Sequence, residues 1–132
     1  MLLVRTTLNA SPIHGFGVFA AEPIAAGTRI WAYDPAIDRI IPGAELPRFP
    51  AHVREYLEHY CEYFPESDEL VLSGDADRFT NHSGDPNTVV EGVNAPTAFV
   101  VAARDIAAGE EITCDYAEIR SLKWPVLTAA VA

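Results

Sequence analysis

The chain of 132 residues carries 9 Lys and Arg against 19 Asp and Glu, which gives a formal net charge of −10. This length gives one domain with a sizeable core and excludes a multidomain enzyme. Apolar residues make up 49% and charged residues 21%, as in soluble globular proteins, and no apolar run is long enough to cross a bilayer. The acidic charge repels phosphate groups, so it disfavours direct binding of nucleic acid and favours a basic partner.

The cysteines do not indicate a metal site. Cys61 and Cys114 lie far apart without a Cys-x-x-Cys pair, and His59 adds only one donor near Cys61. The first residues lack the basic and long apolar regions of a secretion signal, so a reducing cytosol is the expected location, as in a bacterial protein. A nuclear location stays open for an imported effector or a viral protein.

Ten prolines and eight glycines divide the chain into short segments that are rich in Val, Ile, Thr, Phe and Tyr. This pattern is typical of short strands joined by tight turns, so we predict a mostly β domain. The expected strands, in chain order, cover residues 2–7, 17–20, 29–33, 69–72, 88–91, 98–102 and 111–113.

One segment follows a helical pattern instead. Its apolar residues recur at positions i, i+3, i+4 and i+7, namely Val53, Tyr56, Leu57 and Tyr60. Charged residues occupy the other side of the same turns, as in an amphipathic helix. The sequence therefore predicts a short helical insert over about residues 51–63, which ends before Pro65.

Two glycine- or asparagine-rich runs have an ordinary structural interpretation when each is taken alone. Asn81-His82-Ser83-Gly84-Asp85-Pro86-Asn87 is a dense set of turn-forming residues, and composition alone favours a surface turn. Gly15-Phe16-Gly17 lacks the third glycine and the following helix of a dinucleotide site, which disfavours a Rossmann fold.

The combination of three motifs in order changes this interpretation. The motifs are His14-Gly15-Phe16-Gly17-Val18-Phe19-Ala20, Arg78-Phe79-Thr80-Asn81-His82-Ser83-Gly84-Asp85-Pro86-Asn87 and Gly109-Glu110-Glu111-Ile112-Thr113-Cys114-Asp115-Tyr116. Together they resemble the SET-domain protein lysine methyltransferases. The resemblance implies a single SET domain over residues 1–132, with a core over about 5–116 and a tail over 117–132. It also implies short curved sheets and a C-terminal pseudoknot, in which the strand of the last motif passes through a loop around the middle motif.

The resemblance further implies S-adenosyl-L-methionine as cofactor and a lysine of a basic protein, such as a histone or ribosomal protein, as acceptor. The residues that would bind the cofactor are His14, Gly15, Phe16, Gly17, Asn81, His82, Tyr116 and Trp124. Tyr116 would be the catalytic tyrosine, and Tyr33 would join it in catalysis and in lining the lysine channel. For both tyrosines, the alternative is a core position with a satisfied hydroxyl.

The sequence departs from the family at two places. Gly84 stands where many members carry a cysteine, and the tail contains none, so no zinc segment would close the lysine channel. Trp124 could cover cofactor or substrate, or simply anchor the tail, and a second subunit of a homodimer is the other candidate for closing the channel. Cys114 stands where relatives usually carry Phe or Tyr, which would leave room beyond monomethylation and makes it a third channel residue beside Tyr33 and Tyr116.

An acidic stretch precedes the middle motif. It contains eight carboxylates and no Lys or Arg, and its members are Glu55, Glu58, Glu62, Glu66, Asp68, Glu69, Asp75 and Asp77. Such a run is often only a solvated face, but it could also steer a basic tail. A SET-like module that binds a basic peptide without turnover is the rival function, and a different nucleophile, such as a histidine or a small-molecule amine, stays open.

Overall fold

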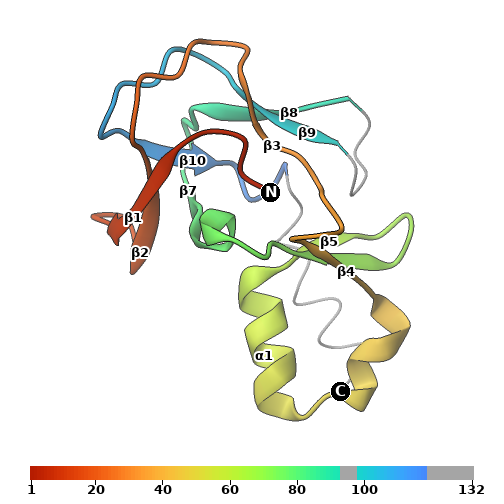
Figure 1. Ribbon diagram of the computed structural model, residues 1–132. Coiled ribbons are helices and arrows are strands. Elements are labelled where there is room, and N and C mark those ends of the chain that lie inside the picture. The colour runs from red at the N-terminus through yellow and green to blue at the C-terminus, as the bar shows by residue number, and fades with distance from the viewer. Residues whose placement is uncertain (93–97, 119–132) are drawn as a thin grey trace.

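In the computed structural model, which describes residues 1–92 and 98–118, short strands dominate and the expected mostly β fold is confirmed. The strands are β1 (Thr6–Ala10), β2 (Phe16–Ala20), β3 (Arg29–Trp31), β4 (Arg39–Pro42), β5 (Glu62–Phe64), β6 (Glu69–Leu72), β7 (Asn81–His82), β8 (Thr88–Glu91), β9 (Phe99–Ala102) and β10 (Glu111–Cys114) (Figure 1). The helices are the α-helix α1 (Ala51–Tyr60) and the 3-10 helices η1 (Gly43–Arg48) and η2 (Ala76–Phe79).

The strands form three small sheets, with the orders β1-β2-β10-β7, β3-β9-β8 and β4-β6-β5. In the first sheet, β10 pairs antiparallel with β2 and parallel with β7. The strand of the last motif therefore lies between the strands that carry the first and middle motifs. The threading of this strand through a loop around the middle motif stays a prediction. Three segments that are distant in sequence meet in one sheet.

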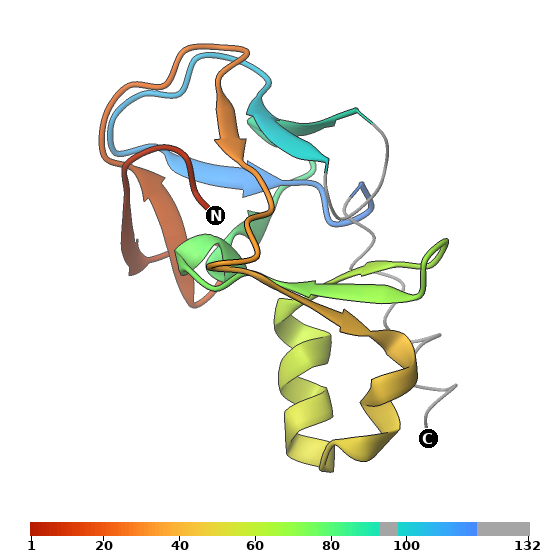
Figure 2. The same cartoon turned by 45° about the vertical axis from the view of Figure 1, so that its right-hand side comes forward.

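Apolar residues form a separate cluster for each part of the fold. The first cluster, which includes β2 and β10, contains Val18, Ala20, Ile24, Ile30, Ala102, Ile106 and Ile112. The second holds α1 and η1 against the β4-β6-β5 sheet and contains Ile41, Leu46, Leu57, Cys61 and Leu70. Figure 2 shows α1 and η1 side by side beneath that sheet. Between these regions, Trp31, Phe64 and Val71 form a third cluster.

Most predicted strands agree with the structure within two residues, and the first one is the exception. A strand was expected over residues 2–7, but β1 begins at Thr6, and Leu2 makes only an isolated bridge to Trp31. The backbone of Leu2 is instead held by the carboxylate of Asp75, to which its N–H donates at 2.8 Å. Three strands were not predicted, namely β4, β5 and β7.

The predicted helix is correct at its start and too long at its end. It was expected to reach about residue 63, whereas α1 ends at Tyr60 and Cys61 has the extended dihedrals φ −89° and ψ 151°. Residues Glu62–Phe64 pair with β6 as β5, so a strand ladder replaces helical hydrogen bonds there. Among the described residues, no helix is long and apolar enough to span a membrane.

Candidate active site

Asn81 of β7 fixes the backbone of the first motif. The residue is buried, and its side-chain Nδ2 donates to the carbonyl oxygens of His14 at 3.0 Å and Phe16 at 2.9 Å. The same nitrogen lies 3.0 Å from Oε1 of Glu111 on β10. Since buried amides require partners, this side chain acts here as a clamp between motifs. A direct contact of Asn81 with the cofactor stays a prediction.

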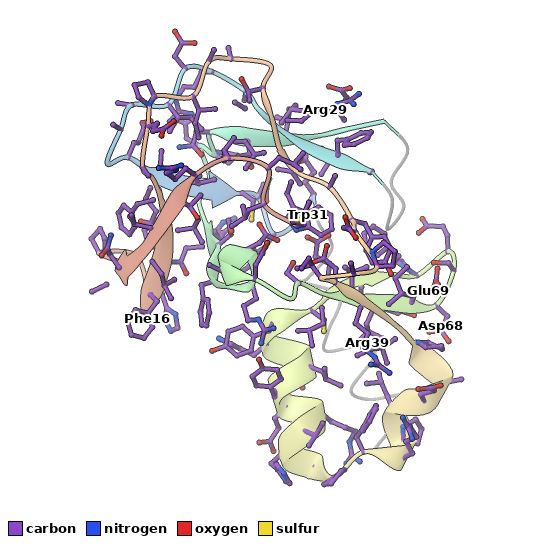
Figure 3. All side chains as sticks on the ribbon, viewed as in Figure 1. Phe16, Arg29, Trp31, Arg39, Asp68 and Glu69 are labelled. Carbon is purple, nitrogen blue, oxygen red and sulfur yellow. The ribbon has the colours of Figure 1, made fainter. Side chains whose placement is uncertain are left out.

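The two glycines of the first motif serve different purposes. Gly15 has φ +49°, in the left-handed region that favours glycine, and open space surrounds the position of a Cβ. Gly17 is buried, and a Cβ there would lie 2.0 Å from Oε1 of Glu111. Gly15 therefore permits the turn, whereas Gly17 permits the close approach of Glu111 to the backbone. Figure 3 shows Phe16, between them, at the turn end of the β1–β2 hairpin.

The three motifs line an open pocket of about 390 Å³, here called the outer pocket. Its lining residues are Ile13, His14, Gly15, Phe16, His59, Tyr60, Arg78, Phe79, Thr80, Asn81, His82 and Tyr116. Phe16 is 58% exposed at this pocket, although it is a large apolar side chain. The volume and the aromatic lining are typical of a small-molecule site. The structure thus brings most of the predicted cofactor residues together, while Gly17 faces Glu111 instead.

Tyr116 lies directly beyond β10, where two hydrogen bonds fix its position. Its hydroxyl donates to the carbonyl oxygen of Thr80 at 3.0 Å, and its backbone N–H donates to Nδ1 of His82 at 3.1 Å. The His82 and Tyr116 rings also contact each other, with centroids 5.2 Å apart. Burial raises the pKa of Tyr116 to about 12, so the phenol stays protonated at neutral pH.

A second, smaller cavity of about 60 Å³ adjoins the outer pocket and is here called the inner pocket. Its lining residues are Ile30, His59, Tyr60, Cys61, Glu62, Val71, Ser73, Asp77, Arg78, Thr80, Thr88, Val100, Ile112, Cys114 and Tyr116. Five side chains line both pockets, namely His59, Tyr60, Arg78, Thr80 and Tyr116. The phenol of Tyr116 therefore stands where the two pockets meet.

Two carboxyl groups line the inner pocket. Burial raises the pKa of Glu62 to about 8, and the charge of Asp77 acts in the same direction. Burial also raises the pKa of Asp77 to about 6, although a hydrogen bond from Oγ of Ser73, at 2.8 Å, opposes the shift. In the sequence, both residues stand out only as members of the acidic stretch. No local pattern marks them, because β5 and η2 each contribute one carboxyl from different parts of the chain.

The two cysteines are buried thiols. Burial raises the pKa of Cys61 to about 12 and raises that of Cys114 well above its usual value, so neither thiol forms a thiolate at neutral pH. Cys114 lines the inner pocket, and its Sγ lies 3.9 Å from the carbonyl oxygen of Asn81. Its place in a lysine channel stays a prediction. Within residues 1–92 and 98–118, no cluster of three or more His, Cys, Asp or Glu side chains is placed to hold a metal ion.

Of the other predicted site residues, Tyr33 lies outside the inner pocket and Trp124 falls outside the described residues. Tyr33 packs against the cluster of Trp31, Phe64 and Val71 and is not among the described residues that line the inner pocket. Its role in the lysine channel stays a prediction. Trp124 lies outside the described residues, so its contact with cofactor or substrate also stays a prediction.

The family model described as SET domain matches residues 15–117, which contain the middle and last motifs and most of the first. Histone-lysine N-methyltransferase set1 of Dictyostelium discoideum is 31% identical over 93% of this chain, and histone-lysine N-methyltransferase ATX2 of Arabidopsis thaliana is 33% identical over 85%. The chain spans only 9% and 11% of the length of these two proteins.

The fold is similar to that of a solved structure from Chaetomium thermophilum, the Polycomb Repressive Complex 2 in an autoinhibited conformation bound to S-adenosylmethionine. The TM-score is 0.67 and the sequence identity is 25%. The match covers 97% of this chain and 16% of the other. Sequence and fold thus point to the same family.

Proposed function

Because this chain belongs to the SET-domain family, as its three motifs predicted, we propose that it transfers a methyl group from S-adenosyl-L-methionine to a lysine of a basic protein. One observation carries the proposal, namely that Tyr116 stands where the outer and inner pockets meet. All three motifs contribute residues to the outer pocket. This arrangement can hold a cofactor on one side of the tyrosine and an amine on the other.

The outer pocket fits this cofactor in size and in lining. Its volume of about 390 Å³ is that of a small-molecule site, and Gly15 leaves backbone uncovered by any Cβ. Phe16 and His14 offer ring surfaces at the same pocket, and His82 borders it beside Tyr116. When bound, the cofactor would supply a methyl group that is already activated by a sulfonium charge.

The residues of the chain would supply alignment and electrostatics rather than a nucleophile of their own. Since the phenol of Tyr116 donates its proton to Thr80, its oxygen can act toward an incoming amine only as an acceptor. The amine must be neutral to attack, and a lysine of ordinary pKa, about 10.4, is neutral in only about 1 of 2,500 molecules at pH 7. The inner pocket must therefore favour loss of that proton.

The substrate class is supported by charge. The chain has a formal net charge of −10, and Glu55 and Glu58 lie on α1, which also contributes His59 and Tyr60 to both pockets. A lysine-containing basic segment, as in a histone or ribosomal protein, would be attracted to this region.

The test is transfer of a labelled methyl group to a mixture of histones and ribosomal proteins, with modified residues identified by mass spectrometry. We expect Tyr116→Phe to lower the rate at least about tenfold, because the acceptor oxygen is lost, while circular dichroism shows an unchanged fold. Tyr63→Phe is the matched control, since that phenol donates to Asp68 outside both pockets. The same spectra count the methyl groups, and Cys114 leads us to expect products beyond monomethyllysine.

Equal rates for wild type and Tyr116→Phe would contradict the assigned role of the tyrosine. A folded wild-type protein that binds the cofactor and a basic peptide, yet transfers no methyl group to any protein, would contradict the proposed activity. That outcome would favour a binding module instead.

A further inference from the structure

One residue of the inner pocket, Glu62, carries a carboxyl group that can accept a proton. Glu62 is the first residue of β5, and it lines the same cavity of about 60 Å³ as Tyr116. Within the described part of the chain, no hydrogen bond or ion pair is made to the Glu62 side chain. Glu62 is only half-buried, so its carboxyl keeps access to the cavity. An ammonium group that entered the cavity could therefore become its partner, in a charge-assisted hydrogen bond.

The neighbouring Asp77 differs from Glu62 in this respect. Its Oδ2 accepts a hydrogen bond from Ser73 at 2.8 Å, and its Oδ1 accepts one from Thr80 at 3.3 Å. Asp77 is thus held in η2 by hydroxyl groups, whereas Glu62 is available toward the cavity. The two carboxyls line the same cavity as the guanidinium of Arg78.

We propose that the carboxylate of Glu62 accepts the proton that the substrate lysine must lose, with Asp77 as the charge that tunes it. This inference rests on the proposed methyltransferase function. In the step, an N–H bond of the ammonium breaks, its electron pair stays on nitrogen, and an O–H bond forms on Glu62. The amine becomes neutral and carries the lone pair that methyl transfer needs. Glu62 returns the proton to solvent when the product leaves.

The electrostatics of the cavity suit this role. With a pKa raised from 4.5 to about 8, Glu62 is a far better match for a lysine of pKa about 10.4 than an ordinary carboxyl would be. The other titratable or charged side chains that line the cavity are His59, Tyr60, Cys61, Asp77, Arg78, Cys114 and Tyr116. The thiols and the phenol are neutral at pH 7, so Asp77 and Arg78 carry the fixed charges that face Glu62.

The pH dependence follows with a definite sign. A carboxyl of pKa about 8 is mostly protonated at pH 7 and mostly ionised at pH 9, so it becomes able to accept a proton as the pH rises. We expect kcat/KM of the wild type to rise about tenfold per pH unit below about 8 and to level off above it. In Glu62→Gln the rise should continue to about pH 10, where free lysine itself loses its proton. In Asp77→Asn, kcat/KM should level off below pH 8, because the charge of Asp77 raises the pKa of Glu62 in the wild type.

A second readout does not involve turnover. Calorimetric binding of a lysine peptide, with S-adenosylhomocysteine present and in buffers of different ionisation enthalpy, counts the protons released. At pH 7 we expect the wild type to release about 0.9 proton per peptide, because Glu62 starts protonated. Glu62→Gln should release close to none. Glu69→Gln, on the neighbouring strand β6, makes the same Glu-to-Gln replacement outside the pocket and should behave as wild type.

The outcomes separate the two proposals. A wild type that transfers methyl groups, together with a Glu62→Gln variant whose proton release and pH profile are unchanged, would overturn the role of Glu62 and leave the methyltransferase function intact. A wild type without transfer contradicts the function itself. If Glu62→Gln does not fold, the pH profile of Asp77→Asn tests the proposal instead. If kcat/KM of Asp77→Asn still levels off at pH 8 or above, Asp77 does not act on Glu62 as proposed.

Discussion

A single carboxylate oxygen joins the motifs at the centre of the site. Oε1 of Glu111 accepts hydrogen bonds from Oγ of Ser11 at 2.7 Å and from Nδ2 of Asn81 at 3.0 Å. Asn81 in turn holds the carbonyl oxygen of Phe16, 65 positions away in sequence. The motifs could be recognised from the sequence, but this clamp could not, because hydrogen bonds between distant residues leave no local pattern. The same holds for Glu62 and Asp77, which appeared only as two members of an acidic stretch.

The close packing of Gly17 against Glu111 predicts that a side chain at position 17 lowers the stability of the protein. In Gly17→Ala the new Cβ would lie 2.0 Å from Oε1 of Glu111, so the carboxylate must move and release Asn81 and Ser11. We expect a loss of about 1–3 kcal/mol in the free energy of unfolding, measured with urea, and weaker cofactor binding by calorimetry. Gly84→Ala is the matched control, since its Cβ meets open space. Equal stability of the two variants would contradict the clamp.

For the helices and strands, the residue pattern predicted some bounds correctly, whereas bounds that depend on strand pairing were missed. The strands at Glu69–Leu72 and Thr88–Glu91 were predicted with their observed bounds, because each contains three consecutive β-branched or apolar residues near turn residues. The end of α1 was missed because the helical spacing continues past Tyr60, whereas pairing with β6 turns Glu62–Phe64 into a strand. Likewise β7 consists of Asn81–His82, polar residues that become a strand only through pairing with β10.

The position of β10 depends on Asn87, which follows the middle motif's turn. This side chain is 2% exposed, donates to the carbonyl oxygen of Glu111 at 2.8 Å and accepts from the N–H of Thr113 at 2.8 Å. Asn87→Ala leaves both backbone groups without their partner, so we expect a loss of about 2–4 kcal/mol in unfolding free energy. Methyl transfer should fall as well, since β10 leads directly to Tyr116.

Asn9→Ala provides the comparison for that variant. Asn9 lies exposed in β1, where its side chain donates to Oγ1 of Thr7, so its removal should change stability by less than about 0.5 kcal/mol. Urea unfolding of both variants measures the difference. If Asn87→Ala unfolds at the same urea concentration as Asn9→Ala, the side chain of Asn87 does not hold β10 in place.

In the folded molecule, the acidic stretch divides into carboxyls that line the inner pocket and carboxyls that face solvent. Glu62 and Asp77 line the inner pocket, and Asp75 caps the start of η2, where its side chain accepts from the N–H of Asp77. The exposed members, such as Glu55 and Glu66, remain on the surface. Composition could predict the attraction of a basic partner, but only the fold separates the charges at the reaction site from those that face solvent.

This division predicts how ionic strength should affect turnover. Surface carboxylates act on a basic peptide through solvent and are screened over about 10 Å at 0.1 M salt, whereas carboxyls in the inner pocket are screened much less. We therefore expect KM for a basic peptide to rise several-fold between about 0.05 and 0.3 M salt while kcat stays nearly constant.

The double variant Glu55→Gln/Glu58→Gln should flatten this rise, because it neutralises the exposed side of α1 next to both pockets. Glu22→Gln/Glu91→Gln makes the same charge change at residues that form surface ion pairs with Arg5 and Arg29, outside both pockets, and should keep the wild-type salt dependence. A KM that does not change with salt, or a kcat that falls with it, would show that the acidic surface does not attract the substrate.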